Sequence, residues 1–239
     1  MIKFFRKIRQ RLLTENKFSK YFIYAIGEII LVVIGILIAL AINNWSETKK
    51  ETIATRNILL EIKEDLFQDK AQLEYSLDKH SKNLEAELRV LKALESKDSL
   101  TEKLSSDLGR VHLARTYYSV SKGYELLKEM NLSSSLDKNL RISLTKYYER
   151  DIPEVYRELD DDKTEYLGFW IPYLREYFKE WEFEKYAIPY DYNQILEDRS
   201  LVTALRIDCV NLRGTIRALD LALKSATDLI DQLPTEKQD

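Results

Sequence analysis

The sequence predicts an all-α protein with a short N-terminal interfacial helix, one transmembrane helix and an extracytoplasmic bundle of about five helices. Three observations support this fold class. Residues 21–42 form one long apolar run. Six glycines and four prolines are few for 239 residues, which favours long helices joined by few turns. Beyond residue 46, leucines recur at steps of three, four and seven residues, which is typical of amphipathic helices.

Residues 1–20 are predicted to form a basic amphipathic segment on the cytoplasmic side of a membrane. In the stretch "MIKFFRKIRQRLL", Phe5, Ile8 and Leu12 share one helical face and basic residues surround it. This pattern is typical of helices that lie on a membrane surface. A flexible basic tag that only enforces topology explains the same residues, and this alternative stays open.

The charge of the chain is divided unevenly along its length. Residues 1–20 contain seven basic residues and Glu15, for a net charge of +6. Because the whole chain carries −3 and Glu28 contributes −1, residues 44–239 carry −8. A basic head suits an anionic membrane surface, and an acidic body argues against nucleic acid as a partner.

Residues 21–43 are predicted to form the transmembrane helix. The 22 residues from Tyr21 to Ile42 include one charge and are long enough to cross the hydrocarbon core. The excess of basic residues before this run places the N-terminus in the cytoplasm and residues 44–239 in the periplasm. The rival interpretation is a cleaved signal peptide, because "ALA" at 39–41 resembles a cleavage site; the 20-residue basic leader and the long apolar run argue against cleavage.

Glu28 is a carboxylate inside the apolar run, where an ionised side chain costs about 2–3 kcal/mol unless it is protonated or partnered. Glu28 and Gly35 lie seven residues apart, and Gly35 and Ala39 form a small-xxx-small pair on the same helical face. We therefore expect this face to pack against a second copy or another membrane protein. Two alternatives are a site near the headgroups without a role, and an ion or proton site within an oligomer.

Two stretches resemble a known family. The opening "MIKFFRKIRQRLLTENKFSKYFIYAIGEIILVVIGILIALAINNW" and the later "GYELLKEMNLSSSLDKNLRISLTKYYE", residues 123–149, are similar to an uncharacterised family of single-span inner-membrane proteins associated with Bacteroidota. The resemblance implies one membrane span in the inner membrane of a Gram-negative cell. It implies no catalytic residue.

Beyond the membrane run, the pattern of leucines, prolines and turn residues predicts the order of the helices. Expected helices cover 46–95, 101–130, 136–150, a fourth beginning at Pro153 with a kink or restart at Pro172, and 198–232, with a loop at 187–193. The last helix has the most regular pattern. Its two seven-residue series predict a coiled-coil-like seam within the bundle, formed by Leu205, Leu212, Leu219, Ala226 and Leu233, and by Val202, Cys209, Ile216, Leu223 and Ile230.

The residues that could carry chemistry favour packing roles. His80 continues an apolar helix face, and Cys209 occupies a seam position, so both are interpreted as buried structural residues. The acidic stretch "LDDDKTE", residues 159–165, lacks the glycine and alternating spacing of a calcium loop. We therefore expect no catalytic residues, no metal site and no cofactor.

Two aromatic clusters are candidates for recognition. Eleven aromatic residues lie between Tyr166 and Tyr192, and Trp170, Tyr173, Tyr177 and Trp181 among them follow helical spacing. They are predicted to form an exposed patch that binds a protein partner; a glycan or the outer leaflet surface as the ligand, and core packing, are the alternatives. The stretch "ARTYYSVSKGY" places Tyr117, Tyr118 and Tyr124 near Arg115, where a small ligand pocket is conceivable.

These observations predict a non-enzymatic scaffold or accessory protein of the bacterial inner membrane. The expected partners are the lipid bilayer, a second copy of the chain through the face of Glu28, Gly35 and Ala39, and an unknown periplasmic or membrane protein. The alternative is a sensory or gating module, in which a ligand bound by the helical bundle acts through the span.

Overall fold

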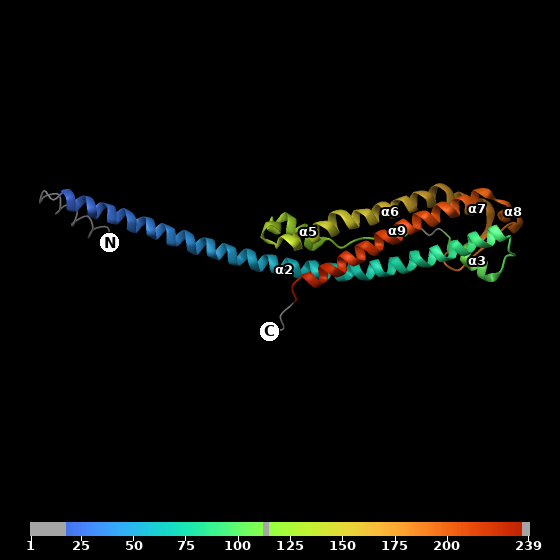
Figure 1. The fold of residues 1–239 in the computed structure, drawn as a ribbon, viewed down its shortest axis with the longest axis horizontal. Helices are drawn as coiled ribbons and strands as arrows, with labels where there is room; N and C mark the ends of the chain where they lie inside the picture. Colours follow the sequence, from blue (N-terminus) through green and yellow to red (C-terminus); the bar gives the residue numbers. More distant parts are fainter. Residues whose placement is uncertain (1–17, 112–114, 236–239) are drawn as a thin grey trace. The chain divides into compact units, whose positions relative to one another are not determined.

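The computed structural model describes residues 18–111 and 115–235, and the chain divides into two compact units, residues 1–54 and 55–239. The predicted interfacial helix lies within residues 1–17, outside the described part of the chain. The described residues are mainly helical, as the sequence predicts (Figure 1).

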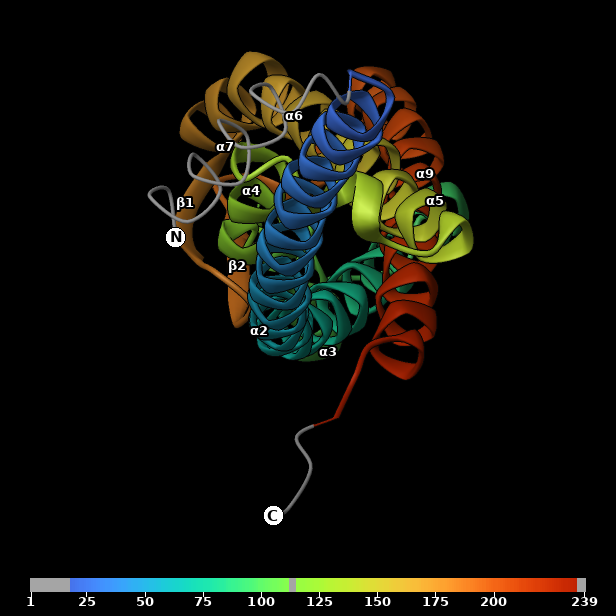
Figure 2. The same cartoon turned by 90° about the vertical axis from the view of Figure 1, so that its left-hand side faces the viewer.

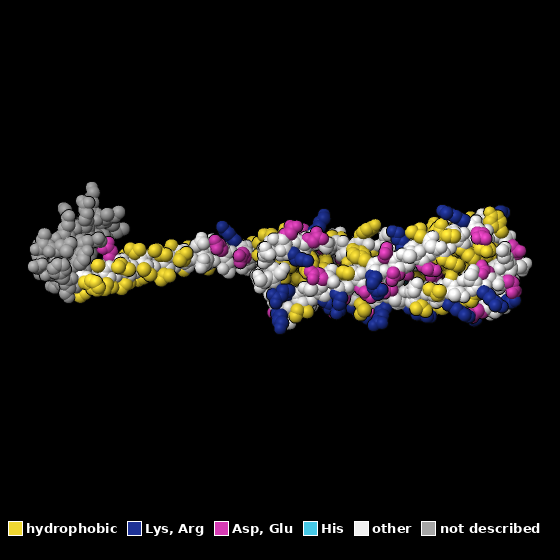
Figure 3. All heavy atoms as spheres, turned by 90° about the horizontal axis from the view of Figure 1, so that it is seen from above, with side chains coloured by type: hydrophobic (Ala, Val, Ile, Leu, Met, Phe, Trp, Pro, Cys, Tyr) yellow, Lys and Arg dark blue, Asp and Glu magenta, His cyan; other side chains and the backbone are white. Residues whose placement is uncertain are grey.

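Helix α2, Phe18–Ser96, contains the described residues of the first unit and extends into the second. Every side chain from Ile29 to Trp45 is exposed, and Figure 3 shows apolar side chains along this part of α2. Among the described residues, α2 is the one helix long and apolar enough to cross a membrane. The structure is therefore compatible with a single-pass membrane protein.

The second unit is a helical bundle built on α2 from Thr55 onward, α9 (Arg199–Gln232) and α6 (Ile152–Glu165). Figures 1 and 2 show α6 and α9 side by side. Fully buried side chains fill the space between these helices, among them Ile62, Leu66, Leu73, Val155, Leu205 and Leu219. Each such side chain contributes about 1.5–3 kcal/mol by leaving water, so the apolar stripes of the three helices hold the bundle together.

Helix α9 confirms the expected last helix, and Asp198 caps it by accepting hydrogen bonds from the amides of Ser200 and Leu201. The first predicted seam series is buried throughout. The second is only partly buried, and the other inner row instead consists of Leu201, Asp208, Thr215, Ala222 and Leu229. An apolar pattern does not reveal this row, because two of its buried members, Asp208 and Thr215, are polar. The Thr215 hydroxyl, for example, donates to Asp162 at 2.9 Å.

The helix predicted over 101–130 is wrong. The structure has two short helices, α3 (Glu102–Leu108) and α4 (Lys122–Glu129), and residues 115–121 between them form neither helix nor strand. We call residues 115–121 the strap. A short 3₁₀ helix, η1 (Leu132–Ser135), follows α4.

The predicted third and fourth helices join into one helical run. It consists of α5 (Lys138–Lys146), the π turn η2 (Tyr147–Asp151), α6, the π turn η3 (Tyr166–Trp170) and α7 (Ile171–Tyr177).

Each π turn precedes an Ile-Pro pair, in "YYERDIP" and "YLGFWIP". The amide of Ile152 bonds to the carbonyl of Tyr147, and that of Ile171 to the carbonyl of Tyr166, five residues back in both cases. Because proline has no N–H and its ring crowds the carbonyl four residues earlier, the wider turn lets the helix continue through it. Pro172 therefore restarts the helix, as expected, without a loop.

The all-α prediction also needs a correction, because residues predicted as helix and loop form a small antiparallel sheet. Its strands are β1 (Phe178–Glu182) and β2 (Tyr186–Pro189), with Trp181 opposite Ala187. Aromatic residues favour the strand conformation, and Glu184 in the connecting loop adopts a left-handed φ of 61°. Helix α8 (Tyr192–Glu197) leads from the sheet to α9.

The sheet packs closely against α3. The Ser105 hydroxyl donates to the carbonyl of Ala187 at 2.9 Å. Gly109 follows α3, and a Cβ atom there would lie 2.6–2.8 Å from the backbone of Tyr186. Glycine therefore permits an approach of the two backbones that any other residue would prevent.

Candidate functional site: a tyrosine cleft

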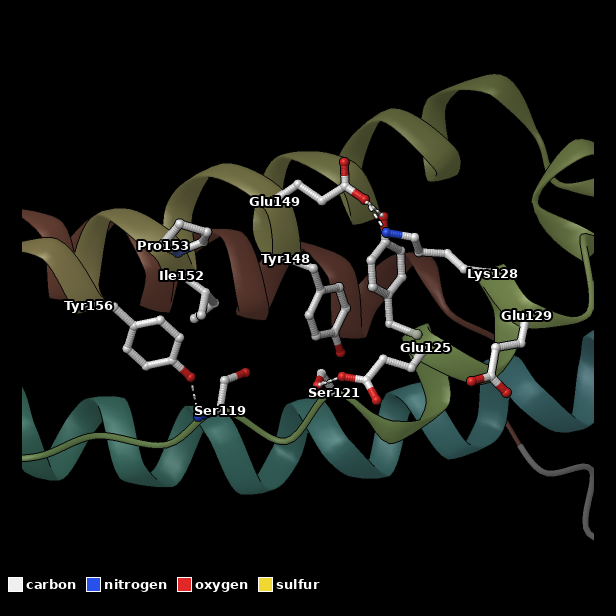
Figure 4. A pocket seen from close by; sticks show the side chains of 11 residues that line it. Ser119, Ser121, Glu125, Lys128, Glu129, Tyr148, Glu149, Ile152, Pro153 and Tyr156 are labelled. Carbon is white, nitrogen blue, oxygen red and sulfur yellow. Dashed lines mark hydrogen bonds and ion pairs between the residues drawn. The ribbon is translucent and has the colours of Figure 1, made fainter.

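An open cleft of about 460 Å³ lies beside the strap, between α4 and the run from η2 to α6 (Figure 4). We call it the tyrosine cleft. It is lined by Ser119, Ser121, Tyr124, Glu125, Lys128, Glu129, Tyr148, Glu149, Ile152, Pro153 and Tyr156. Its volume is in the range of small-molecule and side-chain binding sites.

Two buried carboxylates of α2 fix the strap and the start of α4. Asp69 accepts hydrogen bonds from the Ser119 hydroxyl at 2.5 Å and from the Val120 amide at 2.7 Å. Asp65, one turn earlier on the same face, accepts from the amide of Gly123 at 2.9 Å. These bonds satisfy one backbone amide of the non-helical strap and one at the open N-terminus of α4, and so they stabilise this wall of the cleft.

Asp69 also binds the opposite side of the bundle, because the hydroxyl of Tyr147 donates to it at 2.8 Å. Burial raises the pKa of Asp69 above its ordinary value, and the hydrogen bonds from Ser119, Val120 and Tyr147 offset part of this rise. The strap, α2 and η2 thus meet at one buried acceptor.

Two successive tyrosines, Tyr147 and Tyr148, are both buried because they lie in the π turn η2. The Tyr148 ring stacks on that of Tyr124 with centroids 4.4 Å apart, and it meets Tyr147 edge to face at 4.8 Å. Burial raises the pKa of the Tyr148 hydroxyl, so it stays protonated. Among the residues that the structure describes, this hydroxyl has no hydrogen-bond partner.

The rim of the cleft is acidic. Its charged lining residues are Glu125, Glu129, Glu149 and Lys128, which together carry −2. Glu149 accepts hydrogen bonds from the Lys128 ammonium at 2.8 Å and from the Tyr124 hydroxyl at 2.9 Å. These two donors, Lys128 first, lower the pKa of Glu149, which therefore remains ionised.

The predicted ligand pocket is assembled only in part. Tyr124 lines the cleft, but Arg115 forms an ion pair with Glu184 and lines a separate surface depression. Tyr117 is buried, and Tyr118 is exposed. Tyr148, Glu149 and Tyr156 also line the cleft and were not predicted, although the motif "YYERDIP" marks the π turn that positions the first two.

The predicted aromatic patch is corrected by the structure. Trp170 is 2% exposed and Tyr173 is 5% exposed, and both belong to the core between α7, the sheet and α9. Tyr177 and Trp181 are half-buried and pack against the same core. The Tyr173 hydroxyl also donates to Asp198, the cap of α9, at 2.7 Å. These four residues are thus chiefly packing residues, and they leave no exposed patch of the predicted kind.

In the predicted span interface, Gly35 and Ala39 are exposed on α2 and Glu28 is half-buried. A Cβ atom at Gly35 would meet no other atom within 4 Å. Packing of this face against a second helix stays a prediction.

The two candidate reactive residues are buried, as expected. His80 is 1% exposed and its Nδ1 lies 2.7 Å from the carbonyl of Ser76. Cys209 is 3% exposed, and burial raises the pKa of its thiol to about 12, which suppresses the reactive thiolate. No group of three or more potential metal ligands occurs in the described part of the chain.

Fold and site together define a mainly helical protein with an exposed apolar helix near its N-terminus and a tyrosine-lined, acidic cleft in its helical unit. Residues 28–166, more than half of the chain, match the model of a family of unknown function, DUF6090. The protein belongs to this family. The matched range contains the whole tyrosine cleft. No curated protein and no solved structure matches the chain significantly.

Proposed function

We propose that this protein is a non-enzymatic scaffold or accessory protein of the bacterial inner membrane that binds a protein partner at the tyrosine cleft. The cleft is the observation that carries the proposal. It combines aromatic walls, hydroxyls and fixed charges, the mixture by which binding sites gain both affinity and orientation. Asp69 holds the strap and Asp65 holds the start of α4, so the site is preorganised.

Membrane anchoring is supported by the exposed apolar side chains of α2. Each exposed Leu, Ile or Val side chain costs about 1.5–3 kcal/mol in water relative to burial, and lipid removes this cost for a helix of this length. The basic residues before the span favour an N-terminus in the cytoplasm and residues 44–239 in the periplasm. The resemblance to proteins from Bacteroidota is consistent with this location.

The span oligomerises, in this proposal, through the face of Glu28, Gly35 and Ala39. Two small residues four apart let helix backbones approach closely, and a carboxyl group can form a hydrogen bond across such a contact. A second copy of the chain is the simplest partner, because residues 21–43 are the one span that the sequence offers.

A sensory or gating module is the second candidate, and one observation favours it. Asp65 and Asp69, which hold the cleft wall, belong to the same helix α2 as the apolar segment. Binding at the cleft that alters these bonds would act on α2 directly. In a gating module, Glu28→Gln should change the response to a ligand while assembly stays intact.

Site-specific photo-crosslinking in cells tests recognition at the cleft. A photoreactive amino acid replaces Tyr156, which lines the cleft and is 40% exposed, and in the control it replaces Asp78 on the exposed face of α2. We expect a discrete protein adduct from position 156 and none from position 78. The same adducts from both positions, or none from either, would contradict the proposal.

Oxidative cross-linking in native membranes tests the span interface. The Gly35→Cys variant is made with Cys209→Ser to remove the native thiol, and Leu37→Cys on the opposite face is the matched control. We expect a dimer band from position 35 and a much weaker one from position 37. Equal bands would show that this face is not the interface.

A further inference from the structure

We propose that the tyrosine cleft binds an alkylammonium group, supplied by a lysine side chain of the partner protein, and that Lys128 occupies this subsite until the partner arrives. This inference rests on the proposed role of the cleft in recognition and names the chemistry of its ligand.

The position of Lys128 shows that the rim of the cleft can hold an ammonium group. Its Nζ lies 2.8 Å from Oε1 of Glu149 and 5.4 Å from the centroid of the Tyr124 ring. The same carboxylate oxygen is fixed by the Tyr124 hydroxyl at 2.9 Å (Figure 4). A carboxylate beside an aromatic face is a general arrangement for binding ammonium groups, and Tyr148, stacked on Tyr124, holds that face in position.

Lys128 is a replaceable occupant. Its side chain is 55% exposed and that of Glu149 is 45% exposed, and ion pairs at such exposure contribute little to stability. The Lys128 side chain can therefore turn into solvent when another ammonium group takes its place. It then also ceases to neutralise the rim, which leaves three carboxylates, of Glu125, Glu129 and Glu149, to attract the incoming cation.

The floor of the cleft offers an additional contact. Tyr148 is 9% exposed, and its hydroxyl has no hydrogen-bond partner among the described residues. Figure 4 shows this hydroxyl pointing towards Ser121 and Glu125, whose side chains are joined by a hydrogen bond of 2.7 Å. An ammonium group that reaches this point would donate to the Tyr148 oxygen and to the Glu125 carboxylate, and it would satisfy a buried polar atom.

The shape of the cleft favours a lysine side chain of a protein. Ile152, Pro153 and the ring of Tyr156 provide an apolar wall along which a methylene stem can pack while its charged end reaches the carboxylates. The volume of about 460 Å³ exceeds what one such side chain needs, and the cleft is open to the surface. The backbone on either side of a lysine therefore has room at the entrance.

The test is a titration of the full-length protein in detergent micelles with short capped peptides. The probe is Gly-Gly-Lys-Gly-Gly, and its matched control carries norleucine, which has a similar stem without the charge. Cadaverine, a free diamine, distinguishes a small amine from a peptide. The protein variants are Lys128→Met, Glu149→Gln, Glu125→Gln and the surface control Lys82→Met, and the unfolding midpoint of each variant verifies that it is folded.

We expect the lysine peptide to bind and the norleucine peptide not to bind. Lys128→Met should tighten the affinity for the lysine peptide by about two- to fivefold, since the weakly held tethered ammonium no longer competes. Glu149→Gln, which removes the carboxylate that Lys128 now contacts, should weaken it by about tenfold, and Glu125→Gln, which removes a rim charge at the other end of the cleft, should weaken it less. Lys82→Met, which changes the same charge on an exposed part of α2, should leave it unchanged.

Three results would overturn the inference: equal binding of both peptides, an affinity that falls in Lys128→Met, or binding of cadaverine without binding of the lysine peptide. Photo-crosslinking at position 156 separates this failure from failure of the proposed function. An adduct at position 156 together with any of the three results would leave recognition at the cleft supported and exclude the lysine assignment. Loss of the adduct as well would contradict both.

Discussion

Asp69 is predicted to be the residue on which the strap depends most. Three donors converge on its carboxylate, from Ser119, Val120 and Tyr147, at distances of 2.5 Å, 2.7 Å and 2.8 Å. In Asp69→Ala all three lose their acceptor in a buried place. Each buried donor without a partner costs about 1–3 kcal/mol.

Two effects reduce this loss. Burial raises the pKa of Asp69, so the native protein bears a desolvation cost that alanine removes. The two hydroxyls can also rotate towards water that enters beside the strap. We therefore expect Asp69→Ala to lower the free energy of unfolding by about 2–4 kcal/mol, and Asp69→Asn, which keeps one acceptor oxygen, by about half as much.

The assay is urea unfolding of the full-length protein in micelles, together with amide hydrogen exchange of the peptide that covers the strap. The control is Asp78→Ala, on the exposed face of the same helix, where loss of the pair with Lys82 should cost less than about 1 kcal/mol. Exchange at Val120 should accelerate strongly in Asp69→Ala and stay unchanged in the control. Equal stability and equal exchange in the two variants would refute the reasoning.

Other predictions concern pH and close packing. Burial lowers the pKa of His80 below its ordinary 6.5, so the unfolded chain binds a proton first as the pH falls and stability is lost below about pH 6.5. His80→Gln should therefore reduce the change of the unfolding midpoint with pH between about pH 7.5 and 5.5. An unchanged pH dependence of the midpoint would contradict this role. The ammonium of Lys79 and the guanidinium of Arg115 lower the pKa of Glu184 to about 2. Its contribution to stability is therefore present above the ordinary value of 4.5 and lost as the pH falls towards 2, so Glu184→Gln should lower the midpoint at about pH 6 and have little effect at about pH 2. Gly109→Ala should lower the free energy of urea unfolding by about 1–3 kcal/mol, because the added Cβ meets the backbone of Tyr186. In the control Gly168→Ala the added Cβ meets no atom within 4 Å, so this variant should be neutral or stabilised by up to about 1 kcal/mol. Equal effects of the two substitutions would argue against the close approach of α3 and β2.

The elements that the sequence predicts well are those whose apolar residues face one core. The series from Leu205 to Leu233 is buried throughout, and His80 and Cys209 lie inside, because burial of apolar side chains dominates in long helices. Prediction fails where polar contacts decide the structure. The strap is non-helical where Asp69 accepts the Val120 amide, and Asp65 accepts the Gly123 amide at the start of α4; both carboxylates come from a helix more than 45 residues earlier in the chain.

The aromatic run shows a different limit. The eleven aromatic residues are more than one helix face needs, so some were predicted to lie on the surface. In the structure, Trp170 and Tyr173 instead pack into a core that the small sheet shares with α2, α3 and α9. Of the tyrosine cleft, the sequence indicated only Tyr124 and a general region. Its other wall depends on a π turn, which displaces the helical periodicity that pattern analysis assumes.

The π turn at Tyr147–Asp151 has a consequence for insertions and deletions in this region. It contains one residue more than an α-helical turn would, and this surplus residue sets the rotation of the preceding helix relative to α6. Removing a single residue there would turn everything before it by about 100°, one helical step, and carry the stacked tyrosine pair out of alignment. The length of this segment, as much as its composition, therefore specifies the geometry of the tyrosine cleft.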